Sequence, residues 1–196
     1  MIVNFIGLEL DNLYWSTIKR TITESRLFDY INYQKIKDNT GSTSICDEDP
    51  HITLAYSNEF TKGPNWFNWF LTIKNRDLYN QLRDHDNIKV STPIVDIFDN
   101  PDSKVLKLNM SGCDCIEILR SYSEQLYNLT PNGSDWSSYN PHITLTYLKP
   151  ETPLEYIEDF KNKLISSNYK SFQIKGFMMS EKDNPSPVRI KIQPRE

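Results

Sequence analysis

Two six-residue segments hold the side chains with which this chain could do chemistry. Residues 51–56 read His-Ile-Thr-Leu-Ala-Tyr and residues 142–147 read His-Ile-Thr-Leu-Thr-Tyr, each directly after a proline. Two of the three histidines in the chain open these segments, which we call the sextets. Core packing does not explain a histidine at the same place twice, whereas a duplicated functional element does.

The composition of each sextet predicts a β-strand, because Ile, Thr, Leu and Tyr favour a pleated surface. Strict alternation places the histidine, the threonine and the fifth residue on one face, and Ile, Leu and Tyr on the core face. An imidazole and a hydroxyl then stand about 6.5–7 Å apart along each strand. Two such strands side by side would direct two imidazoles and two hydroxyls into one groove.

That set of groups can cleave a phosphodiester without a metal ion. An imidazole has an unperturbed pKa near about 6.5, so one ring can act as base and the other as acid at neutral pH. Hydroxyl groups can stabilise the charge that grows on the phosphate oxygens. We therefore take His51, Thr53, His142 and Thr144 as the candidate catalytic residues. No carboxylate cage is evident in the sequence, and we expect neither a metal nor another cofactor.

A histidine in a single His-x-Thr strand is usually a partly buried structural residue, and only the repetition of the whole motif favours function. The third histidine, His85, lies between aspartates in a polar turn, and we expect it on the surface. Most of the tryptophans suit a core. Trp136 precedes the second sextet in a polar loop, where an indole can stack on a nucleobase.

Length and composition indicate an ordinary globular protein. The 196 residues are 38% hydrophobic and 24% charged, which suits a single domain of two lobes spanning the chain. A net charge of −4 argues against a partner that is a long nucleic-acid duplex. We expect no membrane span and no signal peptide, and three cysteines held as thiols, so the expected location is the cytoplasm.

Hydrophobic periodicity predicts alternating helices and strands around the sextets. Strands are expected at residues 1–10, 88–98, 104–110, 171–180 and 188–193, and helices at 13–36, 77–84, 116–129 and 153–164. Residues 66–74 suit either state. The order predicts an α+β fold of two pseudo-duplicated lobes, with antiparallel sheets lining a central groove and helices outside.

The paired His-x-Thr motifs resemble those of the 2H phosphoesterase superfamily, and the resemblance covers the whole chain in element order. It implies a bilobal fold, metal-independent phosphodiester chemistry, and catalytic roles for His51, Thr53, His142 and Thr144.

A narrower resemblance is to the phage anti-CBASS nucleases, which degrade cyclic di- and trinucleotide immune messengers. It rests on residues 51–57, residues 104–110 with the helix after them, and residues 135–147. It implies hydrolysis of 3′–5′ linkages in a host cytoplasm, with one histidine deprotonating a 2′-hydroxyl and the other protonating the 5′-oxygen. It also implies substrate contacts from four residues: Tyr14, Trp136, Tyr139 and Glu181.

Other readings stay open at this point. The same fold could act on RNA ends, 2′,3′-cyclic phosphates or 2′–5′ oligoadenylates. The chain could instead be a nucleotide-binding module without turnover, although the presence of both histidines and both threonines weighs against this. The sequence does not assign base and acid to the two histidines.

Overall fold

The computed structural model describes residues 3–11, 15–46, 49–56, 80–84, 87–90, 94–128, 139–166, 171–181 and 188–191. The strands are β1 (Val3–Leu10), β2 (His51–Tyr56), β3 (Asn87–Lys89), β4 (Ile94–Asn100), β5 (Ser103–Asn109), β6 (His142–Leu148), β7 (Ser171–Glu181) and β8 (Val188–Lys191). The helices whose bounds are fully described are α1 (Trp15–Thr23), α2 (Tyr33–Thr40), α5 (Ile116–Tyr127), α6 (Leu154–Ser166) and the 3-10 helix η1 (Arg26–Tyr30).

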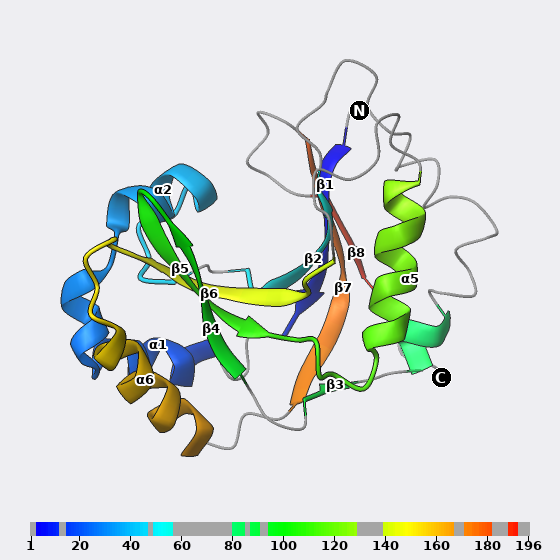
Figure 1. The fold of residues 1–196 in the computed structure, drawn as a ribbon. Helices are drawn as coiled ribbons and strands as arrows, with labels where there is room; N and C mark the ends of the chain where they lie inside the picture. The colour runs from blue at the N-terminus through cyan, green and yellow to red at the C-terminus, as the bar shows by residue number, and fades with distance from the viewer. Residues whose placement is uncertain are drawn as a thin grey trace.

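The strands form an antiparallel sheet in the order β3-β7-β1-β2-β6-β5-β4, with β8 also paired to β7 (Figure 1). The two sextet strands, β2 and β6, lie side by side at its centre and pair at Ile52 and Ile143. This confirms the α+β class and the antiparallel pairing. The expected two sheets are one continuous sheet, because that central pairing joins a β7-β1-β2 half to a β6-β5-β4 half.

The two halves repeat the same strand pairing. Four cross-strand pairs occupy equivalent positions: Glu9 with His51, Asn109 with His142, Gly7 with Thr53, and Lys107 with Thr144. The pairing of Ile52 with Ile143 joins the same position of both sextets. An approximate two-fold axis therefore runs between these two isoleucines.

Both sextets carry a β-bulge at their fourth residue. Leu54 and Leu145 are skipped in the ladders that pair their strands with β1 and β5. A bulge adds a residue to one strand, so the alternation of faces is reversed beyond it. The fifth residues, Ala55 and Thr146, are fully buried in consequence.

The bulge corrects the face expected for the sextet tyrosines. Tyr56 pairs with Phe5, and Tyr147 pairs with Val105. Directly paired residues share a face, and Phe5 lies on the same face of β1 as the partners of the sextet histidine and threonine. The tyrosines are therefore on the histidine face and only partly buried, with Tyr147 packed against the edge of the core.

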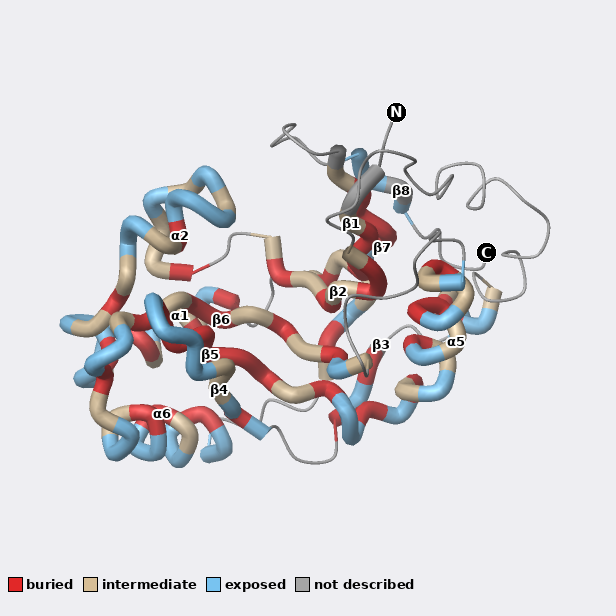
Figure 2. Tube along the Cα trace, turned by 45° about the horizontal axis from the view of Figure 1, so that its top comes forward, coloured by how far each residue is buried: buried red, intermediate tan, exposed pale blue. Residues whose placement is uncertain are grey.

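Helices cover the opposite face and complete the core. In Figure 1, α1 and α6 lie together beside the β6-β5-β4 half, and α5 lies against the other half. On the α5 side, the rings of Tyr122 and Phe177 are 5.5 Å apart. Figure 2 shows the buried stretches running along the central strands and the inner helix faces. None of the helices among the described residues is long and apolar enough to cross a membrane.

The first expected helix is divided into three. Ser25 accepts a hydrogen bond from Leu27 N, and Asn32 accepts one from Lys35 N, so each side chain starts a new helical segment. The strand expected at 88–98 is also divided, because β3 pairs with β7 and β4 pairs with β5. The β4–β5 hairpin, α5, α6 and the closing strands are confirmed. Residues 66–74 lie outside the described chain.

Candidate active site

The central pair of strands brings the four predicted catalytic side chains onto one face. His51, Thr53, His142 and Thr144 are all partly exposed, whereas Ile52 and Ile143 between them are fully buried. Because the strands are antiparallel and meet at the isoleucines, each histidine stands across from the threonine of the other sextet.

Both imidazoles are oriented by the same backbone contact. His51 Nδ1 lies 2.8 Å from the carbonyl oxygen of Asp49, and His142 Nδ1 lies 2.8 Å from that of Asn140. A carbonyl oxygen can only accept, so Nδ1 carries the hydrogen in each ring. In the neutral form, Nε2 is then the ring nitrogen without a hydrogen, the one that can accept a proton. Each histidine is prepared to take or give a proton through Nε2.

The prolines before the sextets help to set this geometry. Pro50 O accepts a hydrogen bond from Leu10 N, and Pro141 O accepts one from Met110 N, both at 2.9 Å. A proline also restricts the preceding residue to an extended backbone. The preceding residue is the one whose carbonyl holds the imidazole, which gives a physical reason for the repeated Pro-His pair.

A phenylalanine also packs against each imidazole. The rings of Phe5 and His51 are 5.1 Å apart at 81°, and those of Phe98 and His142 are 4.9 Å apart at 85°. Both are edge-to-face contacts, a favoured arrangement of aromatic rings. The two phenylalanines come from different places, β1 and the outer strand β4, so this likeness is not a simple copy of the duplicated strands.

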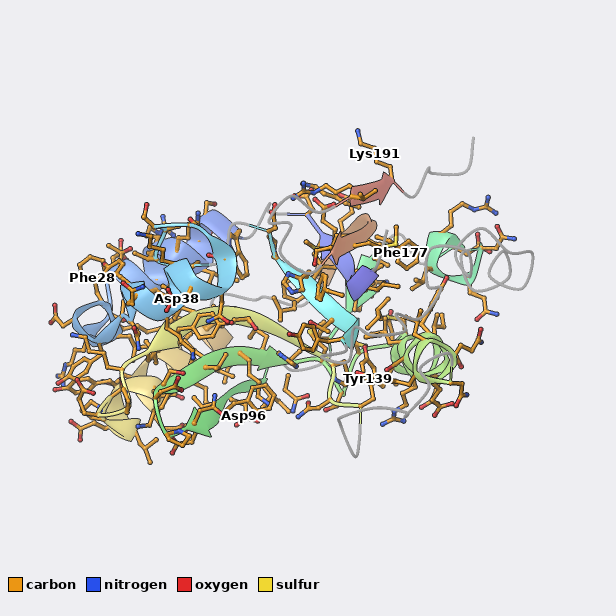
Figure 3. All side chains as sticks on the ribbon, turned by 90° about the horizontal axis from the view of Figure 1, so that it is seen from above. Phe28, Asp38, Asp96, Tyr139, Phe177 and Lys191 are labelled. Atoms are coloured by element: carbon orange, nitrogen blue, oxygen red, sulfur yellow. The ribbon has the colours of Figure 1, made fainter. Side chains whose placement is uncertain are left out.

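The second half of the site contains a buried lysine. The Lys107 side chain is 2% exposed, and its Nζ lies 3.3 Å from the ring centre of Phe98 and 3.6 Å from Asp96 Oδ2. Figure 3 labels Asp96 on β4. In the sequence, Lys107 alternates with Leu106 and Leu108, a pattern that predicts a polar face of the strand. That pattern gives no sign that this lysine is buried beside a histidine.

Burial and neighbouring cations affect the titration of this half. The pKa of His142 is lowered, first by desolvation and then by the charges of Lys107 and His51, while its bond to Asn140 O acts in the opposite direction. Desolvation also lowers the pKa of Lys107, and Asp96 opposes that shift. His142 is consequently biased toward its neutral form.

The first half of the site has a different set of charges. Glu9 pairs with His51 across the strands and is 14% exposed. Arg189 on β8 reaches Glu9 at 3.4 Å and Asp49 at 2.7 Å. Arg189 thereby ties the last strand to the segment whose carbonyl orients His51.

The residues that the resemblance implied for substrate binding are not brought together in the described chain. Tyr14 and Trp136 lie outside it, as does His85. Glu181 ends β7, and its side chain is outside the description. Tyr139, labelled in Figure 3, packs against the core with an inaccessible hydroxyl, and burial raises its pKa. These four substrate contacts stay predictions.

Sequence reasoning missed Phe5, Phe98 and Lys107, together with the two sextet tyrosines. Within the described ranges, no three His, Cys, Asp or Glu side chains gather as a ligand set. The site face carries, among other groups, two imidazole rings and two threonine hydroxyls. They suit proton transfer at two oxygens of one phosphate, with hydrogen bonds to the others.

Comparisons with known proteins give structural similarities of low identity. No protein-family model matches the sequence, and no curated protein matches it significantly. The structure is similar to that of Kluyveromyces marxianus Usb1 (11% identity, 97% of this chain and 98% of that chain, TM-score 0.46). It is also similar to the structure of Kluyveromyces marxianus Usb1 with uridine monophosphate (10% identity, 97% of this chain and 98% of that chain, TM-score 0.46). A crystal structure described as a phosphoesterase is similar as well (12% identity, 98% of this chain and 96% of that chain, TM-score 0.42). These similarities are too distant to assign an activity, which has to come from the site itself.

Proposed function

We propose that this protein is a metal-independent phosphodiesterase of the 2H type that hydrolyses 3′–5′ linkages of cyclic di- or trinucleotide messengers. The observation that carries the chemistry is the meeting of two His-x-Thr strands across an approximate two-fold axis at Ile52 and Ile143. Both imidazoles have Nδ1 bound to a carbonyl, so Nε2 is the nitrogen that would exchange a proton with the substrate. One reacting phosphate would have an acid and a base, one from each half.

The substrate class rests on the sequence resemblance to the phage anti-CBASS nucleases. A 3′–5′ linkage carries its own nucleophile, the neighbouring 2′-hydroxyl, so proton transfer by two imidazoles is sufficient to open it. The net charge of −4 suits a small anionic substrate held locally better than a long duplex.

The test is incubation of the protein with a panel of cyclic dinucleotides in EDTA, with products identified by mass spectrometry. We expect ring opening to a linear product, and no product from the His51→Ala/His142→Ala double variant. Activity only on linear RNA or nucleoside cyclic phosphates would contradict the messenger proposal while keeping the chemistry. Tight binding with recovery of intact ligand would contradict enzymatic function altogether.

A further inference from the structure

Equivalent positions beside the two histidines hold different residues. Lys107 pairs with Thr144, and Gly7 pairs with Thr53, at the same register of the two duplicated strand pairs. One half of the site face therefore has an ammonium group where the other half has no side chain. The glycine matters for packing, because a Cβ there would meet Phe5 Cζ at 2.6 Å.

The ammonium is held close to His142 and away from water. Its side chain is 2% exposed, and Nζ sits 3.3 Å from the centre of the Phe98 ring. The same ring makes the edge-to-face contact with His142 at 4.9 Å. Lys107 and His142 are also diagonal neighbours on one face of β5 and β6, a spacing at which long side chains interact.

Other titratable groups on β2, β4 and β5 lie around this pair. Asp96 on β4 is the counter-ion of Lys107, at 3.6 Å, but it is 48% exposed and so its charge is better screened by water. His51 approaches from β2. Lys104 is on the opposite face of β5, where it donates to Pro150 O and lies 3.8 Å from Asp99.

The charges around His51 are of the other kind. Glu9 stands opposite His51 in the ladder, and Asp49 is two residues before it. Arg189 bridges the two carboxylates from β8. The local balance is thus anionic on the His51 side, whereas a buried cation stands on the His142 side.

We propose that Lys107 is a positioning residue that divides the work between the two histidines. Its ammonium disfavours a second positive charge at His142, so His142 meets the substrate neutral and acts as the base, and His51 supplies the proton as the acid. This assignment rests on the proposed phosphodiesterase function.

The step balances with these roles. His142 Nε2 takes the proton of the 2′-hydroxyl as the 2′-oxygen bonds to phosphorus. The bond between phosphorus and the 5′-oxygen breaks, its electron pair goes to the 5′-oxygen, and His51 Nε2 gives that oxygen a proton. When water opens the resulting 2′,3′-cyclic phosphate, the two histidines exchange roles and return to their starting states.

The charge claim is tested by NMR titration of the imidazoles, which needs no substrate. Because the chain has three histidines, single His→Gln variants assign the signals. Lys107→Met should raise the pKa of His142 by about 0.5–1.5 units, as expected for a cation at the roughly 7–8 Å spacing of diagonal neighbours, at an effective dielectric between those of a protein surface and water. Asp96→Asn removes the counter-ion of Lys107 and should lower the pKa of His142 below its value in the wild type. Lys104→Met removes a buried lysine from the other face and should leave the titration of His142 unchanged.

The same variants should change the pH–rate profile of the enzyme. In Lys107→Met, the acidic limb of kcat/KM should move to higher pH, so activity below that limb falls about 3- to 30-fold, as the pKa change requires. Activity on the plateau should change little, and Lys107→Arg should retain the wild-type profile. A purely structural role would lower the whole curve without moving its limb.

The roles themselves are separated by the leaving group. A cyclic dinucleotide with sulfur in place of the bridging 5′-oxygen has a leaving group that needs no acid. It should restore turnover to His51→Ala and not to His142→Ala, and the reverse would overturn the assignment.

The two proposals fail in different ways. A wild type that cleaves cyclic dinucleotides, with a His142 pKa unmoved by both Lys107→Met and Asp96→Asn, would overturn the role of Lys107 and leave the function standing. A wild type that cleaves no phosphodiester would overturn the function and the assignment of base and acid together, whether or not the titration shows the expected shifts at His142.

Discussion

The two halves of the site share a backbone and differ in charge. In each half a proline precedes the histidine, a carbonyl holds Nδ1, a phenylalanine packs on the ring, and a bulge follows at the fourth sextet residue. The first half then adds Gly7 and an anionic group around Glu9, and the second adds Lys107. Duplication alone would give two identical histidines.

The difference matters because acid–base catalysis needs unlike partners. Two imidazoles in identical surroundings would compete for the same proton, whereas unlike surroundings allow one to be neutral while the other is charged. In the proposed function, the geometry that the halves share would place both rings at one phosphate. A glycine in one half and a lysine in the other, at the same register position, contribute to this difference in charge.

The largest expected effect comes from removing either histidine. His51→Ala and His142→Ala should each reduce kcat by about 10²–10⁴-fold, or about 3–5 kcal/mol, because each removes one proton-transfer group. Steady-state kinetics on the cleaved substrate measures this, and circular dichroism checks that the variants fold. Near-normal turnover in one of them would mean that only one half is catalytic.

The threonines give a smaller effect, in which the halves should be alike. Thr53→Val and Thr144→Val each remove a hydroxyl from the site face, and the loss of one donor to the transition state should cost about 10²-fold in kcat. Thr→Ser keeps the hydroxyl and serves as the matched control. A loss confined to one threonine, or equal losses in the serine variants, would argue against paired stabilisation of the phosphate oxygens.

Gly7→Ala tests the packing on the first half. The new methyl group would displace the Phe5 ring that packs on His51. We expect a loss of about 1–2 kcal/mol in the free energy of unfolding, measured by urea denaturation, with a decrease in kcat of less than 10-fold. Unchanged stability would show that Phe5 moves freely and does not hold the imidazole.

The smallest effect is expected at Arg189. Its ion pairs with Glu9 and Asp49 are partly exposed to water, and such pairs contribute about 0–1 kcal/mol to stability. Arg189→Gln should therefore change the free energy of unfolding by less than about 1 kcal/mol and leave the sextets in place. A loss of several kcal/mol would mean that β8 does more to order the first half than the geometry indicates.

The sequence was sufficient to predict the elements that repeat or alternate strongly. The sextet strands, the β4–β5 hairpin, the α5 helix and the adjacency of His51 and His142 follow from local patterns. The breaks at Ser25 and Asn32 were missed, because capping side chains compete with a long apolar stripe whose continuity suggested one helix.

Features that depend on pairing partners were beyond the sequence. The bulges at Leu54 and Leu145 are set by the register with β1 and β5, and strict alternation therefore assigned the sextet tyrosines to the wrong face. The burial of Lys107 depends on Phe98 and Asp96 from the next strand. No local pattern distinguishes such a lysine from one in water.

The most direct test of the account is the dependence of kcat/KM on pH for a cleaved phosphodiester, measured in EDTA. Two unlike histidines predict a bell-shaped curve. Its acidic limb should lie below pH 6.5, because burial and neighbouring cations lower the pKa of His142 from 6.5. The curve should fall again when the acid loses its proton. A single sigmoid, or activity that appears only when a divalent metal is restored, would contradict paired acid–base catalysis by the two halves.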